Sequence, residues 1–309
     1  MIRARTSSLQ EVGSPGRMIG HTSEQARNRP AHSAAGQARL VSSVFGLLAV
    51  AMPAAGHANP RPLPFSYPYQ TLPRDKFEVE QYVDLVLVRV ARENDAGTEA
   101  VTSVRSILQT ELEFGLTSRL EVGWYFAFRQ GATAGTPALR FEGVKQRLRY
   151  RLADESTWPV DVGLYLEVAE FHDEIEVEEK ILLSRRFGPI SAVANLWVEQ
   201  EYYFQTSEWK YIYNPTLGAT YEISPNLIVG AEYWGRGRFD DATGPSDLDG
   251  TSDAPTGSHH YLGPTVLVQS GELWFSLGAY VRLDSIADDA QVDDPFGKVW
   301  IRTIIGIGF

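Results

Sequence analysis

Residues 160–168 read Val-Asp-Val-Gly-Leu-Tyr-Leu-Glu-Val, and residues 273–282 read Leu-Trp-Phe-Ser-Leu-Gly-Ala-Tyr-Val-Arg. In both stretches an apolar side chain occupies every second position. Successive side chains of a β-strand point to opposite faces of the sheet, so each stretch would present one apolar face and one more polar face. The alternation therefore predicts β-strands with two chemically different faces.

Segments of this kind follow one another from Phe77 to the end of the chain. Short joints such as Gly188-Pro189 alternate with longer connections, several of them rich in Asp, Gly and Ser. Membrane barrels of bacteria have an even strand number, short periplasmic turns and longer outer loops. We therefore predict an all-β fold, a transmembrane antiparallel up-and-down β-barrel of about 12 strands preceded by a cleavable signal peptide. The predicted strands are residues 77–90, 101–115, 119–130, 139–152, 160–170, 173–187, 190–203, 208–222, 227–239, 259–269, 272–283 and 296–309.

The bulk composition is compatible with this fold and excludes some alternatives. The chain has no cysteine, which excludes disulfides and thiol chemistry. Residues 1–58 hold six arginines and two glutamates, so the remaining chain has 22 basic and 37 acidic residues and a net charge near -15. Phosphate binding requires clustered Lys and Arg, so this acidic balance argues against nucleic acid as a partner.

The N-terminal region has the features of a secretory signal. Arg39 precedes an apolar stretch, residues 40–52, which ends at Pro53 and several small residues. Gly56 and Ala58 place small side chains at the positions that signal peptidases recognise, so we predict cleavage between Ala58 and Asn59. A membrane anchor, a transit peptide and a translation start at Met18 or later remain alternatives.

The predicted domain organisation has three parts. Residues 1–58 form the signal peptide with an extended n-region, and residues 77–309 form the outer-membrane β-barrel. Between them, residues 59–76 hold five prolines. Proline lacks the N–H that a strand needs, so this stretch is predicted to be a Pro-rich periplasmic linker. The predicted localisation is the cell outer membrane.

The last strand and the outer surface predict partners for the barrel. Ile305, Ile307 and Phe309 lie on one apolar face that ends on an aromatic carboxyl-terminal residue, and this pattern is typical of the signal read by the barrel-assembly machinery. Aromatic side chains near the strand ends, including Trp209 and Trp234, would form interfacial girdles. Outer-membrane lipid and lipopolysaccharide are the expected contacts, with divalent cations bridging acidic loops around Asp240–Asp253 and Asp284–Asp294 to lipopolysaccharide.

Three stretches resemble a known family. They are Leu72-Pro73-Arg74-Asp75-Lys76-Phe77-Glu78-Val79-Glu80, then residues 113–123 (Glu-Phe-Gly-Leu-Thr-Ser-Arg-Leu-Glu-Val-Gly), then residues 178–188 (Glu-Glu-Lys-Ile-Leu-Leu-Ser-Arg-Arg-Phe-Gly). Together they resemble the outer-membrane barrels assigned to transport and named for the MetA pathway of phenol degradation. The resemblance implies a barrel in the outer membrane. Its motifs are strand and turn patterns, so they carry less information on the substrate.

The face opposite the apolar one carries an unusual amount of charge. We expect Arg151 to pair with Asp161, Lys145 with Glu167, and Lys298 and Arg302 to lie beside Asp84 and Glu80 on closure. Two hypotheses follow: an ion-lined permeation path with Arg147 and Arg149 as a basic ladder, or structural cross-braces that fill the lumen. The lumen-lining candidates are Arg105, Glu111, Glu113, Arg119, Glu121, Arg129, Lys145, Arg147, Arg149, Arg151, Asp161, Glu167, Glu176, Glu178, Lys298 and Arg302.

The leading functional prediction is a passive pore or small-solute transporter, with aromatic or apolar compounds as candidate solutes. A structural or adhesive barrel with a closed lumen is the alternative. An outer-membrane lipid-modifying enzyme using Ser258, His259 or His260 is a third hypothesis, but no lipase-like motif surrounds these residues. We therefore predict no catalytic site, no metal site and no cofactor.

Overall fold

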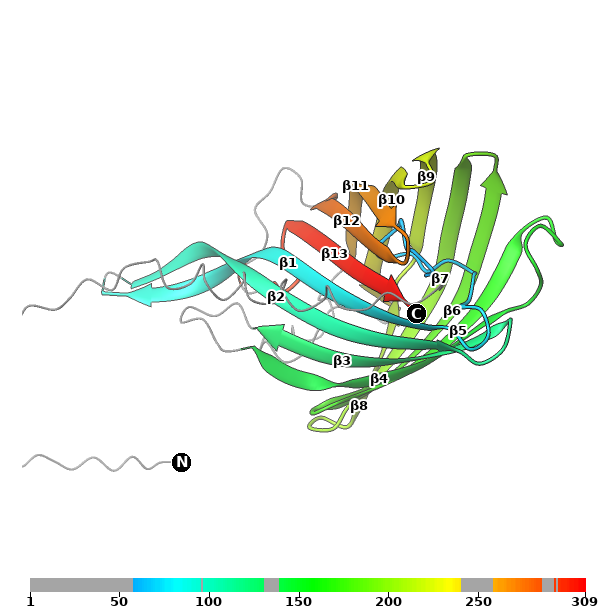
Figure 1. Ribbon diagram of the computed structural model, residues 1–309. Coiled ribbons are helices and arrows are strands. Elements are labelled where there is room, and N and C mark those ends of the chain that lie inside the picture. Colours follow the sequence, from blue (N-terminus) through cyan, green and yellow to red (C-terminus); the bar gives the residue numbers. More distant parts are fainter. Residues whose placement is uncertain (1–57, 96, 131–138, 240–257, 285–291, 293) are drawn as a thin grey trace, which may run out of the picture. The chain divides into compact units, whose positions relative to one another are not determined.

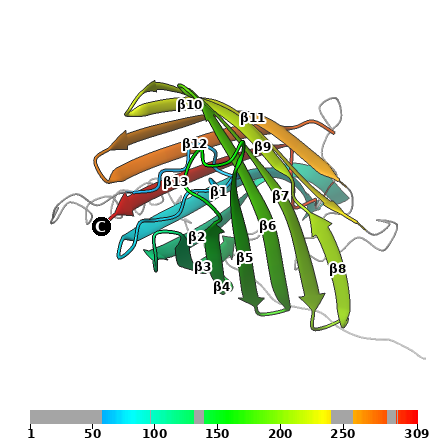
Figure 2. The same cartoon turned by 90° about the vertical axis from the view of Figure 1, so that its right-hand side faces the viewer.

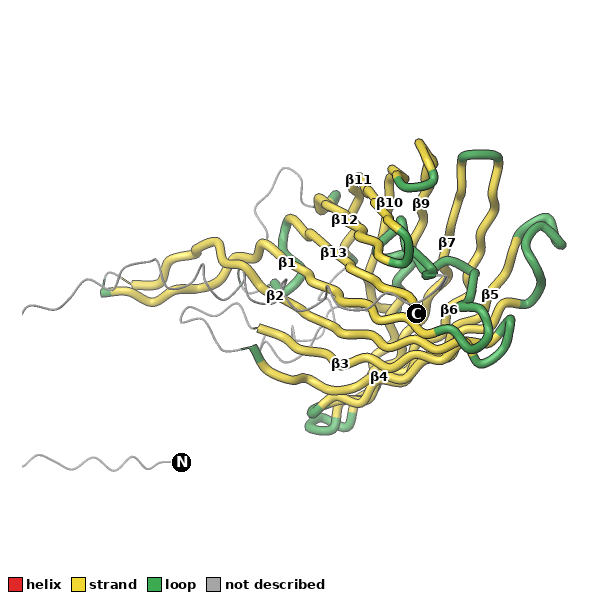
Figure 3. Tube along the Cα trace, viewed as in Figure 1, coloured by secondary structure: helices red, strands yellow, loops and turns green. Residues whose placement is uncertain are grey.

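The computed structural model describes residues 58–95, 97–130, 139–239, 258–284, 292 and 294–309. These ranges form β-strands joined by turns and loops, as the colours of Figure 3 show. They contain no helix that is long and apolar enough to cross a membrane. Residues 1–57 of the predicted signal peptide, and the greater part of the loops at 131–138, 240–257 and 285–293, lie outside the described residues.

The strands agree with the twelve predicted segments to within a few residues. Their bounds are β1 Phe77–Asn94, β2 Gly97–Gly115, β3 Leu120–Gln130, β4 Arg140–Arg151, β5 Asp161–Phe171, β6 Glu174–Phe187, β7 Ile190–Tyr203, β8 Glu208–Tyr213, β9 Thr216–Ser224, β10 Leu227–Arg238, β11 His259–Ser270, β12 Leu273–Arg282 and β13 Val299–Gly308.

These strands form one closed sheet. β1 pairs antiparallel with β2 on one side and with β13 on the other. The remaining neighbours pair in chain order, and the β10–β11 pairing completes the ring (Figures 1 and 2). Each described strand therefore has a partner on both sides, which is the condition for a sheet to span a bilayer without an exposed edge.

β8 and β9 together occupy one strand position. Both pair with β7 and with β10, and only Asn214 and Pro215 separate them. Proline has no N–H to donate, so it interrupts the ladder. The ladder resumes around it: the Asn214 N–H donates to the Trp197 carbonyl at 2.9 Å, and the Gly235 N–H donates to the Pro215 carbonyl at 2.9 Å. The barrel thus has twelve strand positions, and the predicted strand number is confirmed.

Burial is inverted relative to a water-soluble domain. On β5 the apolar Leu164 and Leu166 are 44% and 43% exposed, whereas Tyr165 and Glu167 are 3% and 2% exposed. The same alternation of exposed apolar and buried polar side chains recurs around the ring. An apolar outer face with a polar interior is the arrangement that lipid requires, so the predicted inward and outward faces are confirmed.

The C-terminal residue takes part in closing the barrel. The Phe309 N–H donates to the Phe77 carbonyl at 2.7 Å, and the Phe77 N–H donates to the Phe309 carbonyl at 3.3 Å. The two rings lie 5.9 Å apart. Ile305 and Ile307 are partly exposed on the outer face, as predicted. Recognition of this face by an assembly machinery stays a prediction.

Residues 58–76, which we call the luminal segment, depart from the expected linker. They form no strand, as their prolines predict, but they pack against the inner face of the barrel instead of extending away from it. Leu63, Tyr69 and Leu72 are at most 1% exposed. The segment begins and ends near the short turns and reaches its deepest point at Phe65. The linker prediction missed this packing. A high proline content indicates that a segment does not form the backbone hydrogen bonds of a strand, but it does not indicate where the segment lies.

Placing a charge on the two faces should have unequal costs. Leu166→Arg puts a guanidinium at the middle of β5 on the lipid face, where arginine costs roughly 2–4 kcal/mol. Phe187→Arg, at the end of β6 beside the turn, should cost at most about 1 kcal/mol because the interface tolerates charge. Urea titration of the purified barrel in lipid measures both values. Equal losses for the two variants would contradict the assignment of depth and face.

Candidate functional site

The luminal segment is attached to the barrel wall by backbone groups. The N–H groups of Phe65 and Ser66 donate to the Glu232 carboxylate, the latter at 2.6 Å. Tyr67 donates its N–H to Asn195 Oδ1 at 2.7 Å and accepts from Asn195 Nδ2 at 3.0 Å. The Leu72 N–H donates to Glu121 at 2.5 Å. Three inward side chains on different strands thus satisfy the polar groups of a chain that has no ladder of its own.

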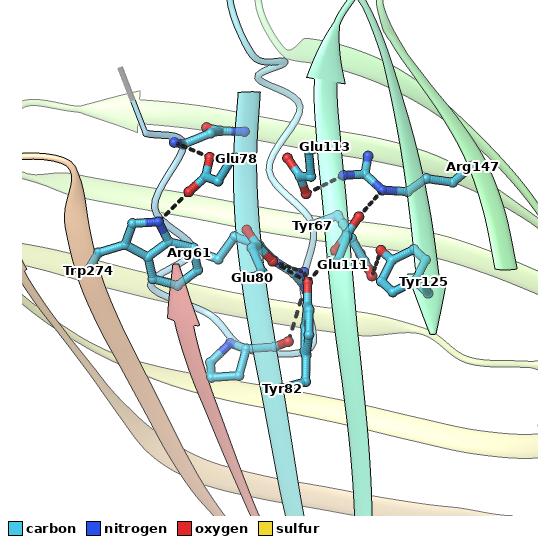
Figure 4. Close-up of polar contacts among 12 residues, drawn as sticks. Arg61, Tyr67, Glu78, Glu80, Tyr82, Glu111, Glu113, Tyr125, Arg147 and Trp274 are labelled. Carbon is cyan, nitrogen blue, oxygen red and sulfur yellow. Dashed lines mark hydrogen bonds and ion pairs between the residues drawn. The ribbon is translucent and has the colours of Figure 1, made fainter. Parts of the chain in front are cut away.

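Arg61 is the main polar side chain of this segment. It is 1% exposed, donates to the Tyr82 hydroxyl and to the Pro64 carbonyl, and lies 3.6 Å from Glu80 (Figure 4). Its guanidinium also stacks 3.8 Å from the centre of the Tyr67 ring. Farther along, burial raises the pKa of the Tyr69 hydroxyl to about 12, so this group stays protonated at neutral pH.

Inward glycines provide the space that the segment needs. A Cβ atom on Gly218 would lie 2.6 Å from the Leu63 side chain, and one on Gly115 would lie 2.0 Å from the Pro73 carbonyl oxygen. At Gly163 it would come within 3.3 Å of the Tyr69 Cα. At these positions the close approach of the luminal segment explains the missing side chain.

The predicted basic ladder is a buried ion cluster. Arg147 forms ion pairs with Glu111, Glu113 and Glu121, and Arg149 pairs with Glu121 at 2.7 Å (Figure 4 shows the Arg147 side). Neither arginine side chain is more than 1% exposed. Their ion pairs join strands β2, β3 and β4, which is the arrangement that the brace hypothesis describes.

The expected partners of these arginines were wrong because the β4–β5 hairpin has a different register from the one assumed. We expected Arg151 opposite Asp161, but Arg151 lies opposite Gly163 and Arg147 lies opposite Glu167. The connection from Arg151 to its partner contains two more residues than assumed, both from the β5 side. Asp161 instead accepts the Ser156 N–H within that turn at 2.6 Å. Arg151 donates to the Ser118 carbonyl and lies 3.3 Å from Asp154.

A second ion cluster lies farther from the short turns. Lys145 is 3.0 Å from Glu167, as predicted, and within 3.7 Å of both Glu176 and Glu178. Lys180 pairs with Glu178 at 2.7 Å. Arg236 on β10 pairs with Glu199 at 2.7 Å and with Glu201 at 2.6 Å. These contacts connect strands β4 to β7 and β10 across the interior.

The remaining predicted residues have different surroundings. Arg302 pairs with Asp84 at 2.6 Å across the closing strands, whereas Glu80 lies opposite Gly306 and not beside a cation of β13. Arg105 donates to the Pro295 carbonyl at 3.1 Å, and the Lys298 N–H donates to the Leu87 carbonyl. Arg119 pairs with Asp154 at 3.2 Å in the exposed turns. Arg129 lies 3.9 Å from Glu142 near the long loops.

The half of the lumen toward the long loops contains a cavity of about 150 Å³. Phe65 of the luminal segment is one of its lining residues. Ten charged side chains line it, five acidic and five basic, so its wall is electrically balanced. The aromatic side chains that line it are Phe65, Phe128, Phe171, Trp197, Trp234, Phe296 and Trp300.

The aromatic part of this wall was missed by sequence reasoning. Trp234 stacks on Phe65 at 4.4 Å and on Tyr261 at 4.2 Å, and the Arg302 guanidinium caps Phe65 at 3.9 Å. We had assigned Trp234 to an interfacial girdle. Its position in the strand, with the same parity as Glu232 and Arg236, was the signal for an inward side chain. The anchors Glu232 and Asn195 were also missed, although each is a polar residue at an inward position.

The histidines and acidic groups show no reacting arrangement in the described part of the chain. Ser258 contacts the Tyr213 hydroxyl, while His259 is buried and lies 3.2 Å from Asp284. Two groups of buried carboxylates, Glu78 with Glu80 and Glu113, and Glu176 with Glu178 and Glu199, each lie close enough to hold a cation. The acidic loop residues 240–253 lie outside the described residues.

Comparison with known proteins supports the fold. No protein-family model matches the sequence, and no curated protein matches it. The structure resembles an outer-membrane channel from Pseudomonas putida F1 with a TM-score of 0.54 and 12% identity, over 78% of this chain and 98% of that one. This chain has the fold of an outer-membrane β-barrel. The NanC porin (TM-score 0.48, 7% identity, 75% and 98% covered) and a variant of the monoaromatic hydrocarbon channel TodX (0.41, 11%, 76% and 89%) are more distant.

Removing a buried brace should destabilise the barrel far more than removing a turn contact. Arg147→Gln leaves three buried carboxylates without their shared partner and should cost roughly 3–5 kcal/mol. Arg151→Gln, whose side chain reaches the exposed turns, should cost less than about 1 kcal/mol. Urea midpoints of the two variants test this difference. Similar midpoints, or a larger loss for Arg151→Gln, would contradict the assignment of Arg147 as a brace.

Proposed function

We propose that this barrel is a passive outer-membrane channel for small solutes, with the luminal segment setting how far the path is open. The observation that carries the proposal is the cavity in the long-loop half, whose lining comes from β1 to β7, β9, β10 and β13. A barrel that served only as a support would have no need for a balanced, partly aromatic chamber. The closed barrel fold and its apolar outer face are consistent with such a channel.

The luminal segment restricts the other half of the path. Its residues Arg61, Leu63 and Tyr69 are fully buried. Its attachment depends on a small number of backbone hydrogen bonds to Glu232, Asn195 and Glu121. Because the luminal segment fills this part of the lumen, the structure also favours the second candidate function, a structural barrel with a closed lumen. The two proposals differ in whether the segment can move aside to open a path.

Loosening the segment separates these candidates. Asn195→Leu removes both hydrogen bonds to Tyr67 and should raise single-channel conductance in planar bilayers at least several-fold, because the backbone of Tyr67 would lose its partner. Gln200→Leu is the matched control: it lies on the same strand, points outward to Glu179, and should leave conductance unchanged. If the wild type and Asn195→Leu are both correctly folded and neither conducts current, the result would support the closed structural barrel.

We further propose small aromatic compounds as the solute class. The aromatic lining of the cavity supports this, as does the resemblance of residues 72–80, 113–123 and 178–188 to the family named for phenol degradation. Ring-bearing solutes gain offset or edge contacts with Trp and Phe side chains that sugars of similar size gain less well. The interspersed ion pairs offer hydrogen bonds to a hydroxyl or carboxyl substituent.

Uptake into liposomes tests the solute class. Phenol or benzoate should enter liposomes containing the barrel, and Trp300→Leu, which shortens the aromatic wall, should reduce this entry several-fold relative to that of a pentose. Trp124→Leu provides the control, because Trp124 is 45% exposed on the outer face. Equal effects of Trp300→Leu on the aromatic solute and on the sugar would argue against aromatic selectivity while leaving a general pore intact.

A further inference from the structure

The start of the luminal segment brings two backbone nitrogens onto carboxylates of the barrel. The Asn59 nitrogen lies 2.8 Å from Glu78 Oε2, and the Ala58 nitrogen lies 2.8 Å from Glu272 Oε2. Ala58 also packs against Gly308, where a Cβ atom would come within 2.9 Å of it. The predicted cleavage site therefore lies directly at the interface between the luminal segment and the last strand.

Glu78 differs from its neighbours in forming no ion pair with any residue that the structure describes. It is completely buried; its Oε1 accepts the Trp274 indole N–H and its Oε2 accepts the Asn59 N–H (Figure 4). Among the described residues, no Lys, Arg or His forms an ion pair with it, although Glu80, Glu111, Glu113 and Glu121 each have one.

The cluster around Glu78 also has an excess of negative charge. Five buried carboxylates, Glu78, Glu80, Glu111, Glu113 and Glu121, share three buried guanidinium groups, those of Arg61, Arg147 and Arg149. Glu80 Oε1 has no hydrogen-bond partner. Carboxylates in a poorly solvated interior require compensating positive charge. An additional cation at Glu78 would supply part of what the cluster lacks.

We propose that the mature amino terminus is this cation: cleavage before Asn59 creates an α-ammonium group that pairs with the buried Glu78 carboxylate and latches the luminal segment inside the barrel. In the cleavage, a signal peptidase adds water across the Ala58–Asn59 peptide bond. The bond between the Ala58 carbonyl carbon and the Asn59 nitrogen breaks, leaving a carboxylate on Ala58 and an amine on Asn59. The amine takes up a proton near neutral pH.

The latch gives the cleavage a structural consequence. Before processing, the Asn59 nitrogen is a neutral amide that donates one hydrogen bond and leaves the Glu78 charge uncompensated. After processing, the same nitrogen carries a positive charge and three donors at the same place. Charge-assisted hydrogen bonds of this kind are stronger than neutral ones. The luminal segment is thus held more firmly in the processed chain than in the precursor, whether or not the barrel conducts.

The reactivity of the amino terminus tests the latch in the mature, full-length barrel. Intact mass should first show that the chain begins at Asn59. Acetic anhydride at pH 7.5 should then acetylate the α-amine at least ten-fold more slowly in the folded barrel than in the urea-unfolded chain, measured on the N-terminal peptide. Glu78→Gln should abolish most of this protection, whereas Glu272→Gln, whose carboxylate contacts the Ala58 nitrogen only before cleavage, should retain it.

A second variant keeps the test decisive if Glu78→Gln does not fold. Inserting Gly-Ser between Ala58 and Asn59 moves the ammonium group away from Glu78 and should raise acetylation to the unfolded rate without changing any barrel residue. Equal reactivity in folded and unfolded wild type would overturn the latch. So would protection unchanged in Glu78→Gln, which would indicate simple burial, or a divalent cation bound at Glu78, Glu80 and Glu113 in the purified wild type.

Discussion

The pairing of β1 with β13 is the constraint on which the rest of this structure depends. A sheet in lipid cannot leave backbone N–H and C=O groups unpaired at an edge, because no water is present to bond them. Register pairs from Glu78 with Gly308 to Leu87 with Val299 join these two strands, and the Phe77–Phe309 contact extends the seam. Once the ring is closed, one set of alternating side chains must face lipid and the other must face the interior.

Closure confines a large number of charges in little space. Charges with poor access to water are tolerated when they are paired, and the inward side chains satisfy this condition through shared, multi-centre contacts such as Arg147 with three glutamates. The polar groups of the luminal segment are also satisfied by inward side chains of the barrel. Glu121 and Glu232 accept its backbone N–H groups, so these carboxylates stabilise chain that has no ladder.

Sequence patterns predicted those features that depend on local alternation. Strand bounds, strand number and the inward or outward side of residues such as Leu164 and Glu167 follow from a period of two, and the structure confirms them. The partners of Arg147 were not predictable in this way. A hairpin connection that takes two more residues from one strand shifts the register by two, which preserves the face of every side chain while changing its neighbour.

The inward packing of residues 58–76 was beyond sequence reasoning for a different reason. Their burial depends on contacts with Asn195, Gly218 and Glu232, which lie more than 100 residues away along the chain, and prolines only report that no ladder forms. Single polar residues at inward positions, such as Asn195 within an apolar run, were the available signal. They indicate that something must satisfy the side chain, but not what does so.

The position of the luminal segment also constrains the order in which the chain can fold. The segment immediately precedes the first strand, yet its anchors come from β3, β7 and β10. Contacts between residues far apart in sequence carry the largest loop-closure entropy, and the seam between the first and last strands has the greatest separation of all. In one folding order, the segment binds to a partly curved, open sheet and is enclosed when β1 pairs with β13. In the other, the barrel closes first and the segment then enters it through the end with the short turns. In the first order, the segment would serve as a template around which the strands curve into a barrel.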